Sequence, residues 1–67
     1  MRLGDAIRAL RLSQKMSQEA LADAARINRT HMGEVERGKR NVSFIAILRI
    51  AAALNLKPSE ILAQAGL

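Results

Sequence analysis

The 67-residue sequence contains no cysteine, and Phe44 is its only aromatic residue. The missing thiols exclude disulfide scaffolds and metal sites built on thiolates. Hydrophobic residues still make up 49% of the chain, so the core must be aliphatic, built from leucine, isoleucine, alanine, valine and methionine. A chain of this length has room for one small core, and we expect residues 1–67 to form a single domain.

Several functional signals are also missing. Apolar runs such as Ile50–Leu54 are far shorter than the roughly 18 residues of a membrane span, and no signal peptide opens the chain, so we expect a cytoplasmic, nucleoid-associated protein. One histidine, no phosphate-binding glycine loop and no spaced metal ligands argue against an enzyme, a metal site or a cofactor. The chain is also too small for a water-excluding pocket, so we expect no small-molecule ligand.

Positive charge is the main compositional feature. Eleven lysines and arginines outnumber six aspartates and glutamates, which gives a net charge of +5. This excess points to an anionic partner such as nucleic acid or a lipid surface, although it could also serve solubility alone. No segment combines a basic face with tryptophan or phenylalanine, which argues against a membrane-surface helix.

Few residues interrupt helical patterns, because the chain has only four glycines and one proline. Leu3, Ile7 and Leu10 recur at helical spacing and predict a helix over about residues 3–13. Capping residues and Pro58 predict four more helices, over about residues 17–25, 28–37, 43–55 and 58–66. The predicted fold class is therefore all-α, with five short helices. In the fourth of them we expect one face to pack in the core, formed by Phe44, Ile47, Leu48, Ala51 and Leu54, with Ile45 and Arg49 opposite.

Residues 17–37 predict two helices joined by a tight turn. Ser17 and Asn28 are good N-caps, and Met16 and Ile27 precede them as apolar staples. Such a short connection makes the two helices cross steeply. Polar residues fall on the outer surface of the pair: Gln18, Arg29, Thr30, His31 and Glu34. This arrangement is typical of a helix-turn-helix, whose second helix enters the major groove of double-stranded DNA.

At these residues the chain resembles the lambda-repressor-like (XRE/Cro-type) DNA-binding domains. Residues 17–22 are similar to the start of the family's second helix, and residues 27–38 to its recognition helix and the exit from it. The resemblance extends from about Leu3 to Leu62 and implies a compact five-helix domain with the helix-turn-helix at helices 2 and 3. Residues 28–30 and 36–41 are especially similar to controller proteins of restriction-modification systems.

Two positions depart from the family pattern. The tight turn often contains glycine in relatives, whereas this chain has Arg26, so we expect a non-glycine residue with positive φ at some cost in strain. The position after Asn41 is often proline in relatives and is Val42 here, which makes the entry into the fourth helix less rigid.

The predicted recognition helix carries the candidate base contacts. Arg29 could donate two hydrogen bonds to guanine O6 and N7, worth about 1–3 kcal/mol of discrimination; a phosphate contact or simple exposure are the alternatives. Thr30 could contact a phosphate or a thymine methyl group, and His31 could contact a phosphate. Glu34 could accept from cytosine N4 or orient Arg29 through a salt bridge, and the sequence leaves both readings open.

Other roles are implied by the resemblance. Gln18 corresponds to a residue that holds a phosphate through its amide, with ordinary surface exposure as the alternative. Lys39, Arg40 and Asn41 correspond to a loop that follows the sugar-phosphate backbone. Arg11 and Glu36 correspond to a partly buried salt bridge that joins the first helix to the end of the recognition helix.

The predicted function is a sequence-specific transcriptional regulator that binds pseudo-palindromic operators as a homodimer and controls its own promoter, either as a restriction-modification controller or as a phage-type repressor. One module buries only about 600–1,000 Å² on DNA, which favours two copies on neighbouring half-sites. The candidate dimer surface consists of Ile45, Ile61, Leu62 and Leu67. The alternative is a protein-interaction module with the same fold, such as an antitoxin or an adaptor.

Overall fold

The computed structural model describes residues 2–67 and contains five α-helices over that range. They are α1 (Leu3–Ser13), α2 (Gln18–Ala25), α3 (Arg29–Glu36), α4 (Phe44–Leu54) and α5 (Pro58–Gln64). No strand is assigned within residues 2–67. The predicted all-α class and the order of the helices are confirmed.

Side-chain caps fix where the middle helices begin. The hydroxyl oxygens of Ser17 and Ser43 each accept a hydrogen bond from the backbone N–H three residues later, at 3.0 Å in both cases. At the start of α3 the Asn28 Oδ1 accepts from two backbone N–H groups, those of Thr30 at 2.8 Å and His31 at 3.3 Å. Each cap satisfies amides that the first helical turn leaves without partners, so the boundaries follow local chemistry.

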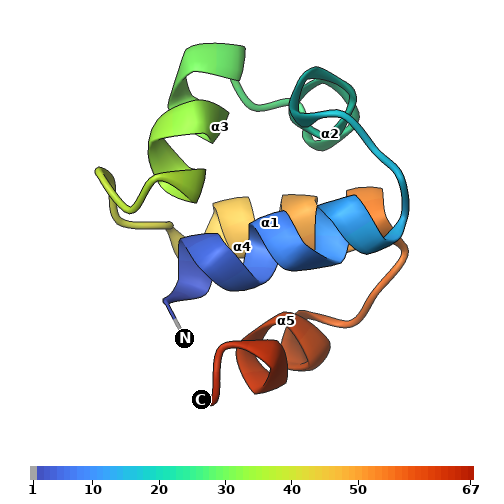
Figure 1. The fold of residues 1–67 in the computed structure, drawn as a ribbon, viewed down its shortest axis with the longest axis vertical. Coiled ribbons are helices and arrows are strands. Elements are labelled where there is room, and N and C mark those ends of the chain that lie inside the picture. The colour runs from blue at the N-terminus through green and yellow to red at the C-terminus, as the bar shows by residue number, and fades with distance from the viewer. Residues whose placement is uncertain (1) are drawn as a thin grey trace.

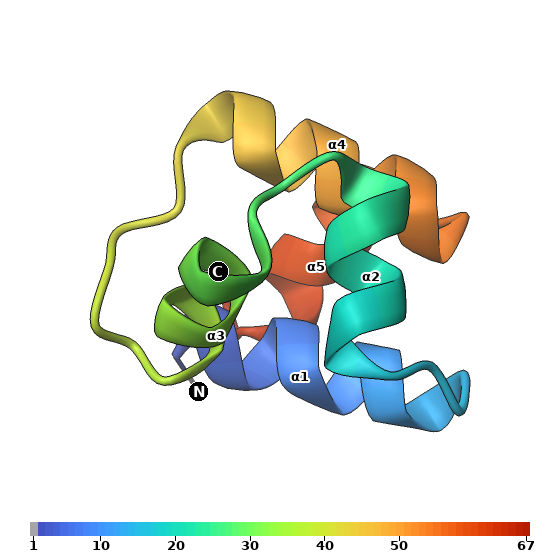
Figure 2. The same ribbon diagram turned by 90° about the horizontal axis from the view of Figure 1, so that it is seen from above.

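The helices form three tiers. In Figure 1, α1 lies in front of α4 in the middle tier, α2 and α3 lie above them, and α5 lies below. Figure 2, seen from above, shows α2 reaching from α1 to α4 beside α3. This arrangement places the α2–α3 pair and α5 on opposite sides of the domain.

The core lies between these tiers and is aliphatic, as the composition predicts. Its largest fully buried side chains come from all five helices: Ile7, Leu21, Met32, Val35, Ile50, Leu54 and Ile61. Met16 and Ile27, the residues before the α2 and α3 caps, are half-buried against this core. The two apolar staples therefore tie the starts of both helices to the rest of the domain.

The predicted core face of α4 is wrong in two positions. Phe44 is 71% exposed and Leu48 is 41% exposed, whereas the buried residues of α4 are Ala46, Ile47, Ile50, Ala51 and Leu54. The helix is apolar nearly all round, so the sequence alone does not show which side packs against α2. Phe44 and Leu48 instead share the exposed side of α4 with Ile45. Among the helices of residues 2–67, none has the length and hydrophobicity that crossing a membrane requires.

Candidate nucleic-acid interface

Helices α2 and α3 are joined by the three-residue turn 26–28. Arg26 closes α2 with φ of 58° and ψ of 43°, which is the left-handed conformation predicted for this position. The Ile27 N–H then donates to the Ala22 carbonyl at 2.9 Å, and Asn28 caps α3. This geometry is that of a helix-turn-helix, with the first turn of α3 directed outward.

The predicted contact residues of α3 lie on its accessible side. Arg29 and Thr30 are exposed, while His31 and Glu34 are half-buried. Glu34 pairs with Arg40 at 3.3 Å and not with Arg29, so the proposed Glu34–Arg29 salt bridge is wrong in this structure. The reason is that the Arg29 side chain turns toward α2, where two carboxylates are closer.

Arg29 is held by Glu19 and Asp23. Its Nε and Nη2 donate to the two oxygens of Asp23 at 3.2 and 2.8 Å, and its Nη1 donates to Glu19 at 2.8 Å. The hydrogen bonds from Arg29 lower the pKa of the Asp23 carboxyl; desolvation opposes this shift and the positive charge of Arg29 adds to it. The same contacts raise the pKa of Arg29. All three side chains are exposed, so DNA could compete for the guanidinium.

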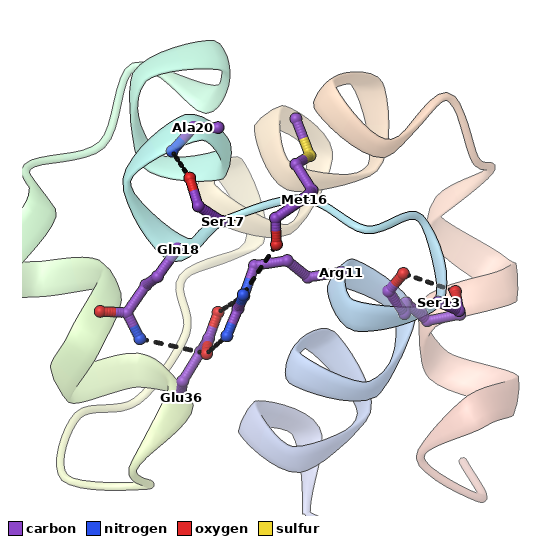
Figure 3. Close-up of polar contacts among 8 residues, drawn as sticks. Arg11, Ser13, Met16, Ser17, Gln18, Ala20 and Glu36 are labelled. Carbon is purple, nitrogen blue, oxygen red and sulfur yellow. Dashed lines mark hydrogen bonds and ion pairs between the residues drawn. The ribbon is translucent and has the colours of Figure 1, made fainter.

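The predicted pair of Arg11 and Glu36 is present and buried. Arg11 Nε and Nη2 donate to the two Glu36 oxygens at 2.8 and 2.9 Å, and their side chains are 8% and 2% exposed. Figure 3 shows Arg11 also donating to the Met16 carbonyl, at 2.8 Å, and Gln18 donating to Glu36, at 3.1 Å. Helix α1, the start of α2 and the end of α3 are thus joined by one polar cluster.

This cluster changes how Gln18 is understood. Its amide nitrogen already binds Glu36, and its half-buried side chain packs beside Gly33 on α3. A phosphate bound at this position could also use the backbone N–H groups that the first turn of α2 leaves without intrahelical partners. Gln18 therefore has a structural contact that the sequence did not predict, and its phosphate role stays a prediction.

The loop after α3 supplies the exposed basic residues Lys39 and Arg40, followed by the exposed Asn41. Gly38 starts this loop with φ of 73°, as expected of the residue that ends α3. The loop borders a surface hollow of about 390 Å³, whose lining is formed by Arg2, Leu3, Gly4, Val35, Gly38, Arg40, Asn41 and Val42. The exposed Arg2 lines the same hollow and so lies beside the predicted backbone-contacting loop.

The four residues predicted for the dimer surface differ in their exposure to solvent. Ile45 and Leu67 are largely exposed and Leu62 is half-buried. Ile61 is fully buried and is therefore wrong as a surface residue, because α5 turns it into the core. Phe44 and Leu48, predicted for the core, are accessible beside Ile45 instead.

The sequence analysis did not predict the ion pairs of Arg29 with Glu19 and Asp23. A signal was available, because the two residues are four apart on α2 and so share one helix face. That face precedes a turn of only three residues, which brings Arg29 back toward it.

Comparison with known proteins identifies the family. Residues 7–61 match the helix-turn-helix family model. Control protein C.BamHI of Bacillus amyloliquefaciens is 43% identical over 60 residues, covering 88% of this chain and 74% of that protein. The controller protein C.AhdI from Aeromonas hydrophila has a solved structure that superimposes with a TM-score of 0.86 at 44% identity, covering 88% of this chain and 89% of the other.

A second solved structure, of a gene regulator, is similar too. The structure of the clp gene regulator ClgR from C. glutamicum matches with a TM-score of 0.90 at 30% identity, over 96% of this chain and 83% of that one. The predicted resemblance is therefore confirmed by both sequence and structure. The chain belongs to the XRE-type helix-turn-helix family of DNA-binding transcriptional regulators.

Proposed function

We propose that the chain is a controller-type regulator that binds its own operator as a homodimer, with α3 of each copy in the major groove. The observation that carries this proposal is the grouping of Arg29, Thr30 and the loop 39–41 on and beside one exposed helix-turn-helix. The names of the similar proteins C.BamHI and C.AhdI support the controller role. We expect regulation through binding alone, without enzymatic activity.

Three groups of residues divide the DNA contacts in this proposal. Arg29 reads a guanine, and Thr30 and His31 add contacts at the start of α3. The α2 N-terminus with Gln18, and the loop residues Lys39, Arg40 and Asn41, bind the phosphate backbone on either side of the groove. The phosphate contacts fix where α3 lies, and Arg29 supplies sequence discrimination.

The homodimer is supported by the exposed apolar side of α4. The side chains of Phe44, Ile45 and Leu48 are all more than one-third exposed. They lie on α4, which is not part of the helix-turn-helix formed by α2 and α3. Covering them with a second copy would bury apolar area and leave both recognition helices accessible. Leu62 of α5 and Leu67, which follows that helix, remain candidates for the same interface.

The first experiment is selection of DNA by the wild-type protein from a randomised duplex of about 30 base pairs, long enough for two half-sites one helical turn apart. Near-physiological salt suppresses non-specific phosphate binding. The expected result is a palindrome whose enrichment is lost with Arg29→Ala and retained with Arg8→Ala, which removes an exposed arginine from α1. A folded protein that enriches no motif would overturn the proposed function.

The dimer is tested separately by sedimentation. Ile45→Glu places a charge in the apolar side of α4 and should shift the protein to monomer. Leu12→Glu places the same charge at an exposed apolar residue of α1 and should leave the mass unchanged. Equal behaviour of the two variants would contradict the proposed interface.

A further inference from the structure

We infer that Glu19 and Asp23 withhold Arg29 from DNA phosphates and thereby set how well the protein distinguishes its operator from other DNA. This inference rests on the proposed function, because it assigns Arg29 to base reading. Glu19 and Asp23 lie on α2, and neither carboxylate is among the DNA contacts proposed above.

The Arg29 guanidinium uses most of its hydrogen-bond donors within the protein. A guanidinium has five N–H donors, and three of them bind the carboxylates of Glu19 and Asp23. One N–H on Nη1 and one on Nη2 have no contact with either carboxylate. Two adjacent donors are what a guanine requires, since O6 and N7 accept one hydrogen bond each. Once the Glu19 contact opens, the outward N–H groups of Nη1 and Nη2 can therefore bind a guanine while Asp23 still holds Nε.

A phosphate differs from a base edge because it carries a negative charge. The group of Glu19, Asp23 and Arg29 carries a net charge of −1, because two carboxylates surround one guanidinium. A phosphate that approaches Arg29 meets both carboxylates at close range, and like charges repel. If Arg29 left them to reach a phosphate, two unpaired carboxylates would face the DNA. The carboxylates thus disfavour phosphate binding far more than binding of an uncharged base edge.

The other basic contact residues are not restrained in this way. Arg40 has a single salt bridge, to Glu34 at 3.3 Å, and Arg29 has two carboxylates at 2.8 Å. The loop that carries Arg40 is predicted to follow the backbone, where a phosphate contact is useful. The two-carboxylate arrangement occurs at the residue assigned to reading a base, and this placement is what points to a role in specificity.

The test compares Glu19→Gln/Asp23→Asn with Asp5→Asn/Glu60→Gln. Both double variants remove two exposed negative charges, but the control changes α1 and α5. Affinity is measured at several salt concentrations for a random-sequence duplex and for the selected operator. We expect the first variant to bind the random duplex about three- to tenfold more tightly, with a salt slope steeper by about 0.9, which corresponds to one added phosphate contact. The ratio of operator to random affinity should fall.

The same substitutions in an Arg29→Ala background decide whether Arg29 is responsible. Without Arg29 the steeper slope should disappear, and circular dichroism should show every variant folded because all the changed residues are exposed. An equal slope change in the control pair, or one that persists in the Arg29→Ala background, would overturn the inference. These measurements use a random duplex, so they remain informative if the operator selection fails and the proposed function with it.

Discussion

The Cα of Gly4 in α1 lies so close to the Val35 carbonyl of α3 that a Cβ atom on Gly4 would come within 2.1 Å of the carbonyl oxygen. The same Cβ would be 3.3 Å from the Glu36 Cα. Backbone atoms cannot turn away as a side chain can. The absence of a side chain at Gly4 therefore allows α1 and the recognition helix to cross closely.

Gly4→Ala should destabilise the domain despite the better helix propensity of alanine. We expect the free energy of unfolding to fall by about 1–3 kcal/mol, because the overlap forces a backbone shift. Urea denaturation followed by circular dichroism measures the change. Gly33→Ala is the control, since its Cβ would meet only the ends of the Arg37 and Gln18 side chains, at 3.1 and 3.3 Å. A near-neutral Gly4→Ala would contradict the close crossing.

The buried pair of Arg11 and Glu36 should be costly to break. Arg11→Met or Glu36→Gln alone should lower the free energy of unfolding by about 3–5 kcal/mol, because each leaves a buried partner uncompensated. Replacing both by methionine should recover much of that loss. Thermal melts of the variants measure it. Arg40→Ala removes the accessible pair with Glu34 and should cost less than about 1 kcal/mol. Equal losses at the two pairs would show that burial does not decide the outcome.

Arg26→Gly should stabilise the protein. Arg26 has positive φ, and the left-handed conformation costs a residue with a Cβ roughly 1–2 kcal/mol. The greater freedom of glycine in the unfolded chain offsets about 0.4–1 kcal/mol of this, so we expect a gain of roughly 0.5–1 kcal/mol. Asn55 has the same φ of 58°, but asparagine tolerates this conformation better. Asn55→Gly should accordingly gain less, and the reverse order in urea denaturation would refute the explanation.

Acid titration should detect the contact between Asp23 and Arg29. The pKa of Asp23 is lowered below its ordinary value of 3.8, so its ion pair contributes to stability above that pH and is lost as pH falls through the lower folded value. NMR titration of the carboxyl carbon measures the midpoint directly. Arg29→Ala should return the Asp23 pKa toward 3.8, while Arg40→Ala should not move it. An unshifted Asp23 in the wild type would show that the contact does not form in solution.

The sequence predicted the helices well where short-range chemistry decides them. Ser17, Asn28 and Ser43 each bind amides within their own first turn, so a local pattern contains the whole interaction. Arg26 was likewise placed correctly, because a three-residue turn leaves few backbone conformations.

Prediction failed where packing between helices decides the outcome. Phe44 and Leu48 are as hydrophobic as the buried residues of α4, and the positions of α1, α2 and α5 determine which side of α4 is covered. Ile61 was assigned to the surface for the same reason. The carboxylates that bind Arg29 lie on α2 and not on α3. Predicting this contact would have required knowing how the two helices cross.

The single aromatic residue has a practical value that follows from its position. Phe44 is largely exposed at the start of α4, and the only other aromatic ring protons in the sequence are those of the His31 imidazole, which lies in α3. The five ring protons of Phe44 therefore form an isolated, unlabelled NMR reporter on the surface proposed to bind a second copy. Dilution of the wild-type protein should move these signals as copies separate, which gives a dissociation constant without any dye, tag or substitution.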